Sequence, residues 1–404
     1  MSGFYEKIVR PVAFSLDAET AHELGLESLR LGLWTSVARR IAATRYAGAA
    51  PELGPLDRFG LTFSNPLGVA AGFDKNGLVV DQLAALGFGC VEVGTVTFEA
   101  QQGNAKPRMF RLPADKALIN RLGFNNDGAA TVADRLRGIR RDCIVGVNIG
   151  KNKYVLNEEA VENYVAAFDV VHAVADYITV NVSSPNTPNL RQLQHGENLE
   201  ELIKALVERN KVLSSPSVLS SPFVLSSAFR RQNAETGPPK GGTQNEDGTQ
   251  NEDGTQNAKP ILIKIAPDLN EADIEMIVDT CIRHGVAGIV ATNTTVDRDG
   301  LKTRGVEKFG SGGLSGYPLA SRSNQVISTV YRYSKGKIPI VGVGGIFTAE
   351  DAFAKVAAGA SLLQAYTGFI YEGPAFARKI NTGLARLLKE KGFERLDDAV
   401  GSSI

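Results

Sequence analysis

Two hydrophobic patterns alternate along most of the chain. The first is a short, nearly continuous apolar run of the β type, found at 66–71, 90–96, 144–149, 177–182, 261–265, 288–292, 339–343 and 361–366. The second is a longer stretch of helical character that follows each run, at 76–87, 127–138, 158–175, 199–211, 271–284, 319–334, 349–358 and 373–391. Continuous apolar strands joined by helical crossovers indicate a parallel sheet. Eight strand–helix units predict an α/β fold, a closed (β/α)8 TIM barrel, with an open doubly wound sheet as the alternative.

The region before the first strand carries a helical signature of its own. Asp17 is a candidate N-cap residue. Apolar positions recur after it at helical spacing, at Leu26, Leu29, Leu33, Val37 and Ile41, flanked by Leu24, Leu31 and Trp34. One interpretation is a helical cap packed on the barrel; the other is an amphipathic pair on a membrane surface, with Arg39 and Arg40 toward anionic lipid. We therefore divide the chain into an amphipathic N-terminal segment, 1–50, and a barrel, 51–404.

One stretch of the barrel region has a different composition. Residues 212–258 contain two tandem hexapeptide arrays, VLSSPS, VLSSPF and VLSSAF, then GTQNED, GTQNED and GTQNA. Such a composition buries too little apolar surface to offset its ordering entropy. The stretch falls between the fourth helix and the fifth strand, on the face opposite the carboxyl ends of the strands. We predict a disordered, dispensable surface insertion, with a partner-binding loop as the alternative.

Charge and composition exclude several classes of protein. Lys plus Arg and Asp plus Glu each number 44, and this balance argues against general nucleic-acid binding. No apolar run approaches the 18 residues of a transmembrane helix, and no signal or transit-peptide pattern is seen at the start. Cys90, Cys143 and Cys281 lie far apart, and the four histidines are scattered. We therefore expect no metal site, no disulfide framework and no iron–sulfur cluster held by this chain.

Polar residues gather where the predicted strands end. In a barrel, the carboxyl ends of the strands form the active-site face. The residues at these ends are Ala71 to Lys75, Thr95, Asn148, Asn181 to Thr187, Lys264, Thr292 to Thr294, Gly344 and Gly345, and Tyr366 and Thr367. Singly, an Asn or Ser at a strand end is usually a turn or cap residue. Together they predict a polar ligand, because buried amides are costly when unpaired.

Two glycine-rich loops are expected late in the chain. Residues 311–316 follow the sixth strand, and residues 342–345 end the seventh. Loops after the last strands of a barrel commonly bind phosphate through backbone N–H groups. Their placement favours a phosphate-bearing cofactor.

These residues stand in motifs that resemble a known family. The motifs are AAGFDKNG (70–77), INRLGFNN (119–126), NVSSPNTPNLRQLQ (181–194), KIAPDL (264–269), ATNTT (291–295), SGGLSG (311–316) and GVGGI (342–346). Over residues 4–392, apart from the insertion, the chain resembles dihydroorotate dehydrogenases of the second, membrane-associated class. The resemblance implies oxidation of (S)-dihydroorotate to orotate in pyrimidine (UMP) biosynthesis. FMN would accept the hydride, and a membrane quinone would be the final acceptor.

The resemblance also assigns roles to individual residues. The FMN ring and ribityl chain would contact Ala71, Gly72, Phe73, Asp74, Lys75, Thr95, Asn148, Asn181, Lys264 and Thr292. The phosphate would be held by Gly316, Gly345, Tyr366 and Thr367. Dihydroorotate would be bound by Lys75, Asn120, Arg121, Leu122, Gly123, Phe124, Asn181, Asn186, Asn293 and Thr294. Lys264 would stabilise a reduced, anionic flavin.

Ser184 would be the base that removes the C5 proton. A hydroxyl is a weak general base, and the sequence places no His or Asp beside it, so shielding from solvent and a relay through Thr187 are expected to assist. The soluble class of the family uses a cysteine in this loop. None of the three cysteines lies there, so the chain agrees with the membrane class.

By the same resemblance, the N-terminal helices would form a funnel for quinone. His22, Arg111 and Tyr366 would line its inner end. The expected partners are dihydroorotate and orotate, a quinone and the bilayer surface, without nucleic acid or an iron–sulfur subunit. We expect a monomer bound peripherally to the cytoplasmic face of a bacterial inner membrane.

Three alternative functions remain open at this stage. One is a soluble-type dihydroorotate dehydrogenase that uses fumarate or NAD. Another is an FMN barrel that oxidises a 2-hydroxy acid, although that chemistry needs a His base and an Arg clamp. The third is a catalytically inactive flavin-binding module that docks on membranes.

Overall fold

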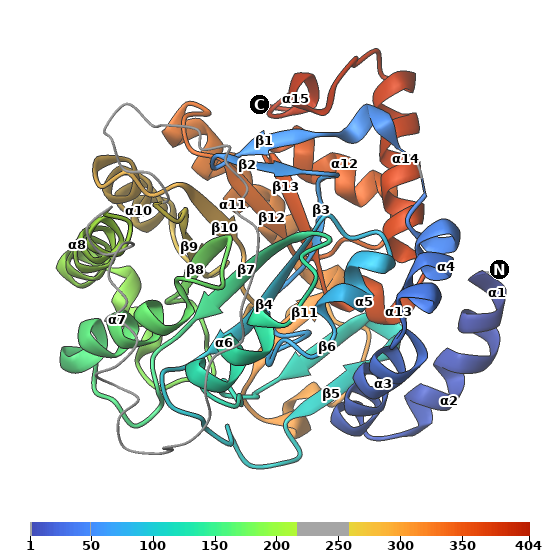
Figure 1. Ribbon diagram of the computed structural model, residues 1–404, viewed down its shortest axis with the longest axis horizontal. Helices are drawn as coiled ribbons and strands as arrows, with labels where there is room; N and C mark the ends of the chain where they lie inside the picture. The colour runs from blue at the N-terminus through green and yellow to red at the C-terminus, as the bar shows by residue number, and fades with distance from the viewer. Residues whose placement is uncertain (1, 49, 216–257) are drawn as a thin grey trace, which may run out of the picture.

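Eight parallel strands close into a barrel, in the order β10-β12-β13-β3-β4-β7-β8-β9 (Figure 1). This computed structural model describes residues 2–48, 50–215 and 258–404. The barrel strands are β3 (Leu67–Val69), β4 (Cys90–Val96), β7 (Ile144–Ile149), β8 (Tyr177–Asn181), β9 (Ile261–Ile265), β10 (Gly288–Ala291), β12 (Ile340–Val343) and β13 (Leu362–Ala365). Each lies within one of the predicted apolar runs. The prediction of a closed barrel is confirmed, and the open sheet is excluded.

A helix follows each barrel strand in the sequence, as the alternating pattern predicts. These helices are α5 (Val80–Ala85), α6 (Ala129–Arg137), α7 (Ala160–Val171), α8 (Gly196–Leu213), α10 (Glu271–Arg283), α11 (Ala320–Ser334), α12 (Ala349–Ala357) and α14 (Phe376–Glu390). Short helices are η2 (Pro51–Leu53), η3 (Pro113–Asp115), η4 (Asn157–Glu159), η5 (Leu190–Gln194), η6 (Val306–Phe309), η7 (Tyr317–Leu319), α13 (Thr367–Glu372) and α15 (Leu396–Ala399). Side chains of the strands and of the inner helix faces form one continuous core.

Two small antiparallel sheets were not predicted. The strands β1 (Leu56–Arg58) and β2 (Leu61–Phe63) pair as a hairpin before the barrel. A second sheet joins β5 (Met109–Leu112), β6 (Ala117–Asn120) and β11 (Gly313–Gly316). The prediction of a loop over 311–316 is therefore wrong for its last four residues. Glycine permits this pairing, because a Cβ at Gly316 would lie 2.8 Å from Ala117 Cα on β6.

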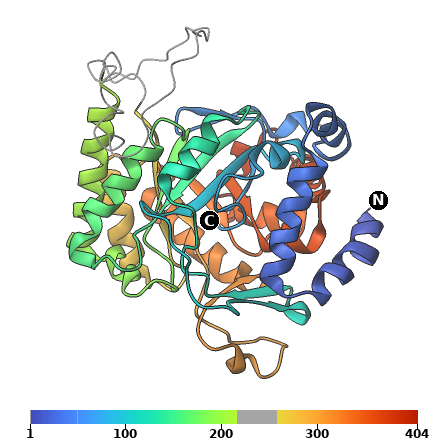
Figure 2. The same ribbon diagram turned by 60° about the horizontal axis from the view of Figure 1, so that its bottom comes forward.

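The N-terminal segment is helical and packs on one side of the barrel, away from α7 and α8 (Figures 1 and 2). It consists of α1 (Ser2–Phe4), η1 (Tyr5–Val9), α2 (Arg10–Ser15), α3 (Ala18–Gly32) and α4 (Ser36–Tyr46). Asp17 caps α3 as predicted, accepting from the N–H groups of Glu19 and Thr20 at 3.0 Å. A buried ion pair fixes α3 to the barrel, with Arg108 Nη2 2.6 Å from a Glu19 oxygen.

The apolar residues of α3 and α4 divide between two surfaces. Leu26, Leu29 and Leu33 pack against the barrel core. Other apolar side chains remain more than half exposed, namely Leu24, Leu31, Trp34, Val37 and Ile41. Both interpretations of the segment are thus compatible with the structure: one face is a cap, and the other is free. Within the described ranges, no helix is long and apolar enough to cross a bilayer.

The predicted insertion, 212–258, begins in the last two residues of α8 and ends before β9, between the fourth helix and the fifth strand. Residues 216–257 lie outside the described part of the chain, so the prediction of disorder there stays a prediction. Val212 and Leu213 still belong to α8, and Leu213 packs against the core. Asn210 joins the two ends: its side chain donates to Lys259 O at 2.8 Å and accepts from Lys259 N at 3.1 Å.

Candidate active site

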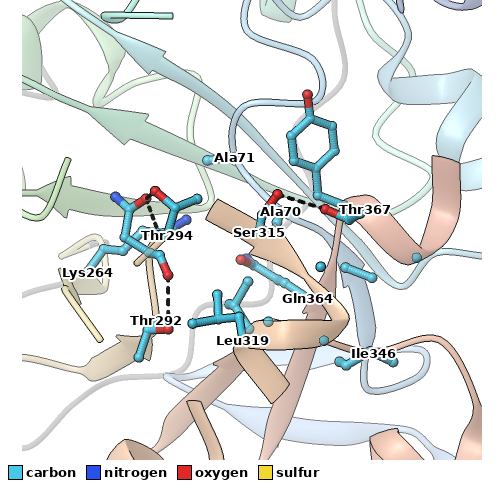
Figure 3. A pocket seen from close by; sticks show the side chains of 18 residues that line it. Ala70, Ala71, Lys264, Thr292, Thr294, Ser315, Leu319, Ile346, Gln364 and Thr367 are labelled. Atoms are coloured by element: carbon cyan, nitrogen blue, oxygen red, sulfur yellow. Dashed lines mark hydrogen bonds between the residues drawn. The ribbon is translucent and has the colours of Figure 1, made fainter. Parts of the chain in front are cut away.

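A cavity opens at the carboxyl ends of the barrel strands (Figure 3). It brings together many of the predicted residues, namely Ala71, Lys264, Thr292, Asn293, Thr294, Gly316, Gly345, Tyr366 and Thr367. Figure 3 shows Lys264 and Thr292 on one side of the cavity and Ser315 and Thr367 on the other. The strand-end residues therefore converge on one space, as a barrel requires.

A chain of hydrogen bonds links the amide side chains of neighbouring strands. The Thr95 hydroxyl donates to Asn148 Oδ1 at 2.6 Å and accepts from Asn181 Nδ2 at 2.8 Å. Asn181 Oδ1 accepts in turn from Asn293 Nδ2 at 3.2 Å and from the Ser183 hydroxyl at 2.9 Å. Four of the predicted residues thus act as one rigid unit.

Glu92, in the middle of β4, determines which groups donate and which accept in this hydrogen-bond network. It is completely buried and accepts from Asn148 Nδ2 and Gln364 Nε2, each at 2.8 Å. Tyr177 and Thr179 donate to the same carboxylate at 3.1 Å. Sequence reasoning missed Glu92 and Gln364, although an acidic residue and an amide inside apolar runs were a usable signal.

Lys264 lies on β9 with its side chain at the cavity wall. Burial lowers the pKa of its ammonium group, while the negative charge of Glu92 opposes that shift. Among the described residues, no hydrogen bond from its Nζ is present. A buried cation without a hydrogen-bonded partner is suited to an anionic ligand.

The other end of the cavity is built from backbone and hydroxyl groups. The N–H of Gly345 has no acceptor within the described part of the chain. The Tyr366 hydroxyl is buried without a partner, and the hydroxyls of Ser315 and Thr367 lie 3.0 Å apart. A Cβ at Gly345 would lie 2.5 Å from Ala320 Cα, so only glycine fits there. Ser315 was missed because it sits in a segment interpreted as a loop.

The loop after β8 carries Ser184, which is only 5% exposed. Its Oγ accepts from the N–H of Asn186 at 3.2 Å, and no acceptor for its own proton is present in the described structure. The nearby Thr187 hydroxyl is buried and unpartnered. Asn186 Nδ2 donates to Asn120 Oδ1 at 3.1 Å, which joins this loop to β6.

The segment from Asn120 to Phe124 borders the same loop. Asn104 holds the two together, donating to Arg121 O at 2.9 Å and to Asn186 O at 3.2 Å. The Arg121 guanidinium is occupied by backbone oxygens of Phe309, Ser311 and Pro107. It therefore acts on the chain around the site. The backbone oxygens from Arg121 to Phe124 are occupied as well, by donors on Asn104, Gln101 and Asn126.

The loop after β3 folds over the barrel edge. Gly72 N donates to Gly94 O at 2.7 Å. The buried carboxylate of Asp74 accepts from the N–H groups of its own loop, at Asn76, Leu78 and Val79. Asp74 thus shapes the loop, and its predicted contact with the cofactor stays a prediction.

A second cavity, of about 550 Å3, lies between α3 and the barrel. Its lining includes His22, Leu26, Phe73, Lys75 and Leu122. Burial and the nearby Lys75 charge lower the pKa of His22 to about 3, so its ring is neutral.

Two of the three predicted tunnel residues meet beside this cavity. The His22 ring is edge-on to Phe73 at 5.2 Å and to Tyr366 at 6.3 Å. Arg111 is not part of the lining; it donates to Phe14 O at 2.8 Å and lies over the Phe14 ring. No group of three or more His, Cys, Asp or Glu able to hold a metal occurs in the described residues.

The fold and this site define a (β/α)8-barrel enzyme whose strand ends gather polar side chains around one cavity. The sequence model of the dihydroorotate dehydrogenase family matches residues 56–388. The chain belongs to this family.

Curated relatives and solved structures agree with that membership. The chain is 46% identical to a dihydroorotate dehydrogenase (quinone) of Roseiflexus sp. (strain RS-1), over 98% of this chain and 97% of the relative. It is 43% identical to one from Deinococcus deserti, over 98% and 99%. The ferulenol-bound dihydroorotate dehydrogenase of Eimeria tenella superposes with a TM-score of 0.77 at 34% identity, covering 95% of each chain.

Proposed function

We propose that the protein oxidises (S)-dihydroorotate to orotate in pyrimidine biosynthesis, with FMN as the bound cofactor and a membrane quinone as electron acceptor. The proposal is supported by the near full-length similarity to enzymes named dihydroorotate dehydrogenase (quinone). The observation that carries it is the set of strand-end side chains that meet at one cavity.

The cavity fits a flavin mononucleotide. The unpaired N–H of Gly345, within the described part of the chain, suits a phosphate. The ring of Tyr366 packs on His22 and Phe73, so the proposed phosphate contact of this residue would come from its backbone. Thr367 and Gly316 complete that end, and Ala71, Gly72, Thr95, Asn148, Asn181, Lys264 and Thr292 would hold the ring and ribityl chain. When bound, FMN supplies a two-electron acceptor. Lys264 favours negative charge on the ring through its buried ammonium.

The hydrogen-bond directions determine what the site offers to a substrate. Because Glu92 is acceptor-only, Asn148 must turn its NH2 toward it and its oxygen toward Thr95. Thr95 then accepts from Asn181, whose second N–H is left free while its oxygen is already filled. The site thus presents a fixed donor, matched to the carbonyl or carboxylate oxygens of dihydroorotate.

The substrate would be bound by the segment 120–124 and by the loop after β8. Lys75 supplies positive charge, and amides and backbone groups match the edges of a small planar anion. The proposed contacts are Asn120, Arg121, Leu122, Gly123, Phe124, Asn181, Asn186, Asn293 and Thr294.

Ser184 Oγ is the group that takes the proton from C5 of the substrate. Its oxygen accepts from the Asn186 N–H, and the described residues offer it no other partner, so a lone pair is available. The Thr187 hydroxyl is buried without a hydrogen-bond partner among the described residues, so the expected relay from Ser184 to Thr187 has no direct hydrogen bond behind it. Burial of both hydroxyls excludes bulk water.

The N-terminal helices provide the route for quinone. Exposed Trp34, Val37 and Ile41 would enter the lipid headgroup region, with Arg39 and Arg40 toward anionic lipid. The cavity behind α3 leads to His22 and Phe73, and Phe73 touches Tyr366 of the first cavity at 5.7 Å. The enzyme would act as a monomer at the cytoplasmic face of a bacterial inner membrane.

An anaerobic flavin titration tests this function. Dihydroorotate is added to the purified holoprotein while the flavin absorbance is followed, and a short-chain quinone is added next. Bleaching followed by rapid recovery is expected. Recovery only with fumarate or NAD would overturn the quinone assignment, and no bleaching in a protein that holds FMN would overturn the substrate.

A further inference from the structure

Lys355, on α12, is a buried cation outside the set of residues discussed so far. Its side chain is only 1% exposed. Its Nζ donates to Ser323 Oγ and to Asn324 Oδ1 on α11, each at 2.9 Å. No carboxylate forms an ion pair with it among the described residues. Burying an ammonium group on neutral partners is costly, so a packing role alone would be served better by an apolar residue.

One of these partners connects Lys355 to the wall of the first cavity. The Ser323 hydroxyl donates its single proton to Val343 O at 2.6 Å, so it must accept from Lys355. Val343 ends β12, and its carbonyl belongs to the peptide unit that leads into Gly344. The same oxygen also accepts from the Thr292 N–H at 3.1 Å. Because a peptide unit is planar, these two hydrogen bonds together fix the direction of the Gly344 N–H.

We propose that Lys355 is a positioning residue for the phosphate of the bound cofactor. Acting through Ser323, it orients the peptide of Gly344 and adds a buried positive charge behind the phosphate-binding loop. The inference rests on the proposed binding of FMN. Charge-assisted donation also polarises the Ser323 hydroxyl, which strengthens its bond to Val343.

The electrostatics of Lys355 agree with this role. Burial lowers the pKa of Lys355 to about 7, and Asp351, one turn earlier on α12, opposes that shift. A phosphate anion nearby favours the charged form of the lysine. Reciprocally, the charged lysine favours the bound phosphate.

The test compares three single variants in the full-length protein freed of cofactor. Lys355→Met removes the charge, and Ser323→Ala breaks the connection to Val343. Asn324→Ala is the matched control, since Asn324 contacts Lys355 without a hydrogen bond to the loop. The dissociation constant for FMN is measured by fluorescence quenching, and that for riboflavin, which lacks the phosphate, in parallel. The melting temperature of each apoprotein reports on its folding.

We expect Lys355→Met and Ser323→Ala to weaken FMN binding about tenfold, equivalent to ~1.4 kcal/mol. Riboflavin binding should change less than about twofold, and Asn324→Ala should leave both constants near wild type. Equal losses for FMN and riboflavin, or lower melting temperatures with unchanged FMN affinity, would overturn the proposal. If Lys355→Met fails to fold, the FMN and riboflavin dissociation constants of Ser323→Ala test the proposal. FMN binding without reduction by dihydroorotate would refute the proposed substrate and leave this inference standing.

Discussion

Replacing Ser184 with alanine separates proton removal from binding and from quinone reduction. The substitution removes one buried oxygen and leaves the Asn186 N–H without its 3.2 Å acceptor. That loss costs about 1 kcal/mol of folding free energy. Against a total stability of about 5–15 kcal/mol, the variant stays almost entirely folded. Any large loss of rate must therefore arise in the reaction.

The expected loss of rate is much greater than the loss of stability. A positioned general base contributes roughly 10²–10⁴ to a rate, or about 3–5 kcal/mol of activation free energy. The assay is stopped-flow reduction of the flavin by dihydroorotate under anaerobic conditions, followed by reoxidation with quinone. We expect slow reduction, unchanged reoxidation and an unchanged KM for quinone.

The neighbouring Ser183 provides the control. Its hydroxyl donates to Asn181 and accepts from Asn293, so it belongs to the binding network. Ser183→Ala should raise the dissociation constant for dihydroorotate more than it slows reduction. Flavin reduction in Ser184→Ala within about threefold of wild type would refute the assignment of the base.

Four further outcomes follow from the geometry. Burial lowers the pKa of Lys75 to about 8, so its ammonium form, and with it kcat/KM for dihydroorotate, should decline as the pH rises above that value. Gly345→Ala should weaken FMN binding at least tenfold, because the new Cβ would lie 2.4 Å from Ala320 Cβ. Trp34→Asp should lower binding to anionic vesicles severalfold, measured by co-sedimentation. Deletion of residues 216–257 should leave kcat nearly unchanged in a steady-state assay.

Each of these outcomes has a control and a contradicting result. A KM for dihydroorotate that stays level above the pKa of Lys75 would argue against contact with that residue. Gly285→Ala adds a Cβ at positive φ with nothing within 4 Å, so it isolates backbone strain from the clash at Gly345. Leu156→Asp, at another exposed apolar position, should not alter vesicle binding. A large fall in kcat after the deletion would mean that the insertion contacts the catalytic face.

The barrel could be predicted from the sequence because its strands are short, continuous apolar runs, and its helices are longer stretches of helical pattern between them. The sheet formed by β5, β6 and β11 could not, since these strands interrupt the strand–helix alternation: β5 and β6 lie between β4 and α6, and β11 lies between β10 and α11. Asn181 and Lys264 could be predicted as candidate site residues from their positions at strand ends, because the barrel topology brings such residues together.

The sequence did not reveal the roles of residues that act through others. Glu92 and Lys355 lie within a strand and a helix, and their importance comes from contacts with segments far away in the chain. The position of Arg111 was likewise set by tertiary packing, because the Phe14 ring and carbonyl hold its guanidinium. The sequence pattern assigns a residue to a helix or a strand, but only the folded structure shows which residues it contacts.

The double hydrogen bond between Asn210 and Lys259 has a consequence for how this gene can change. The two ends of the segment between α8 and β9 are fastened to each other before the segment begins. Gain or loss of hexapeptide units by replication slippage would then alter the length of the protein without moving the barrel. A reporter or an affinity module could be inserted at the same junction, on the face of the barrel opposite the active site.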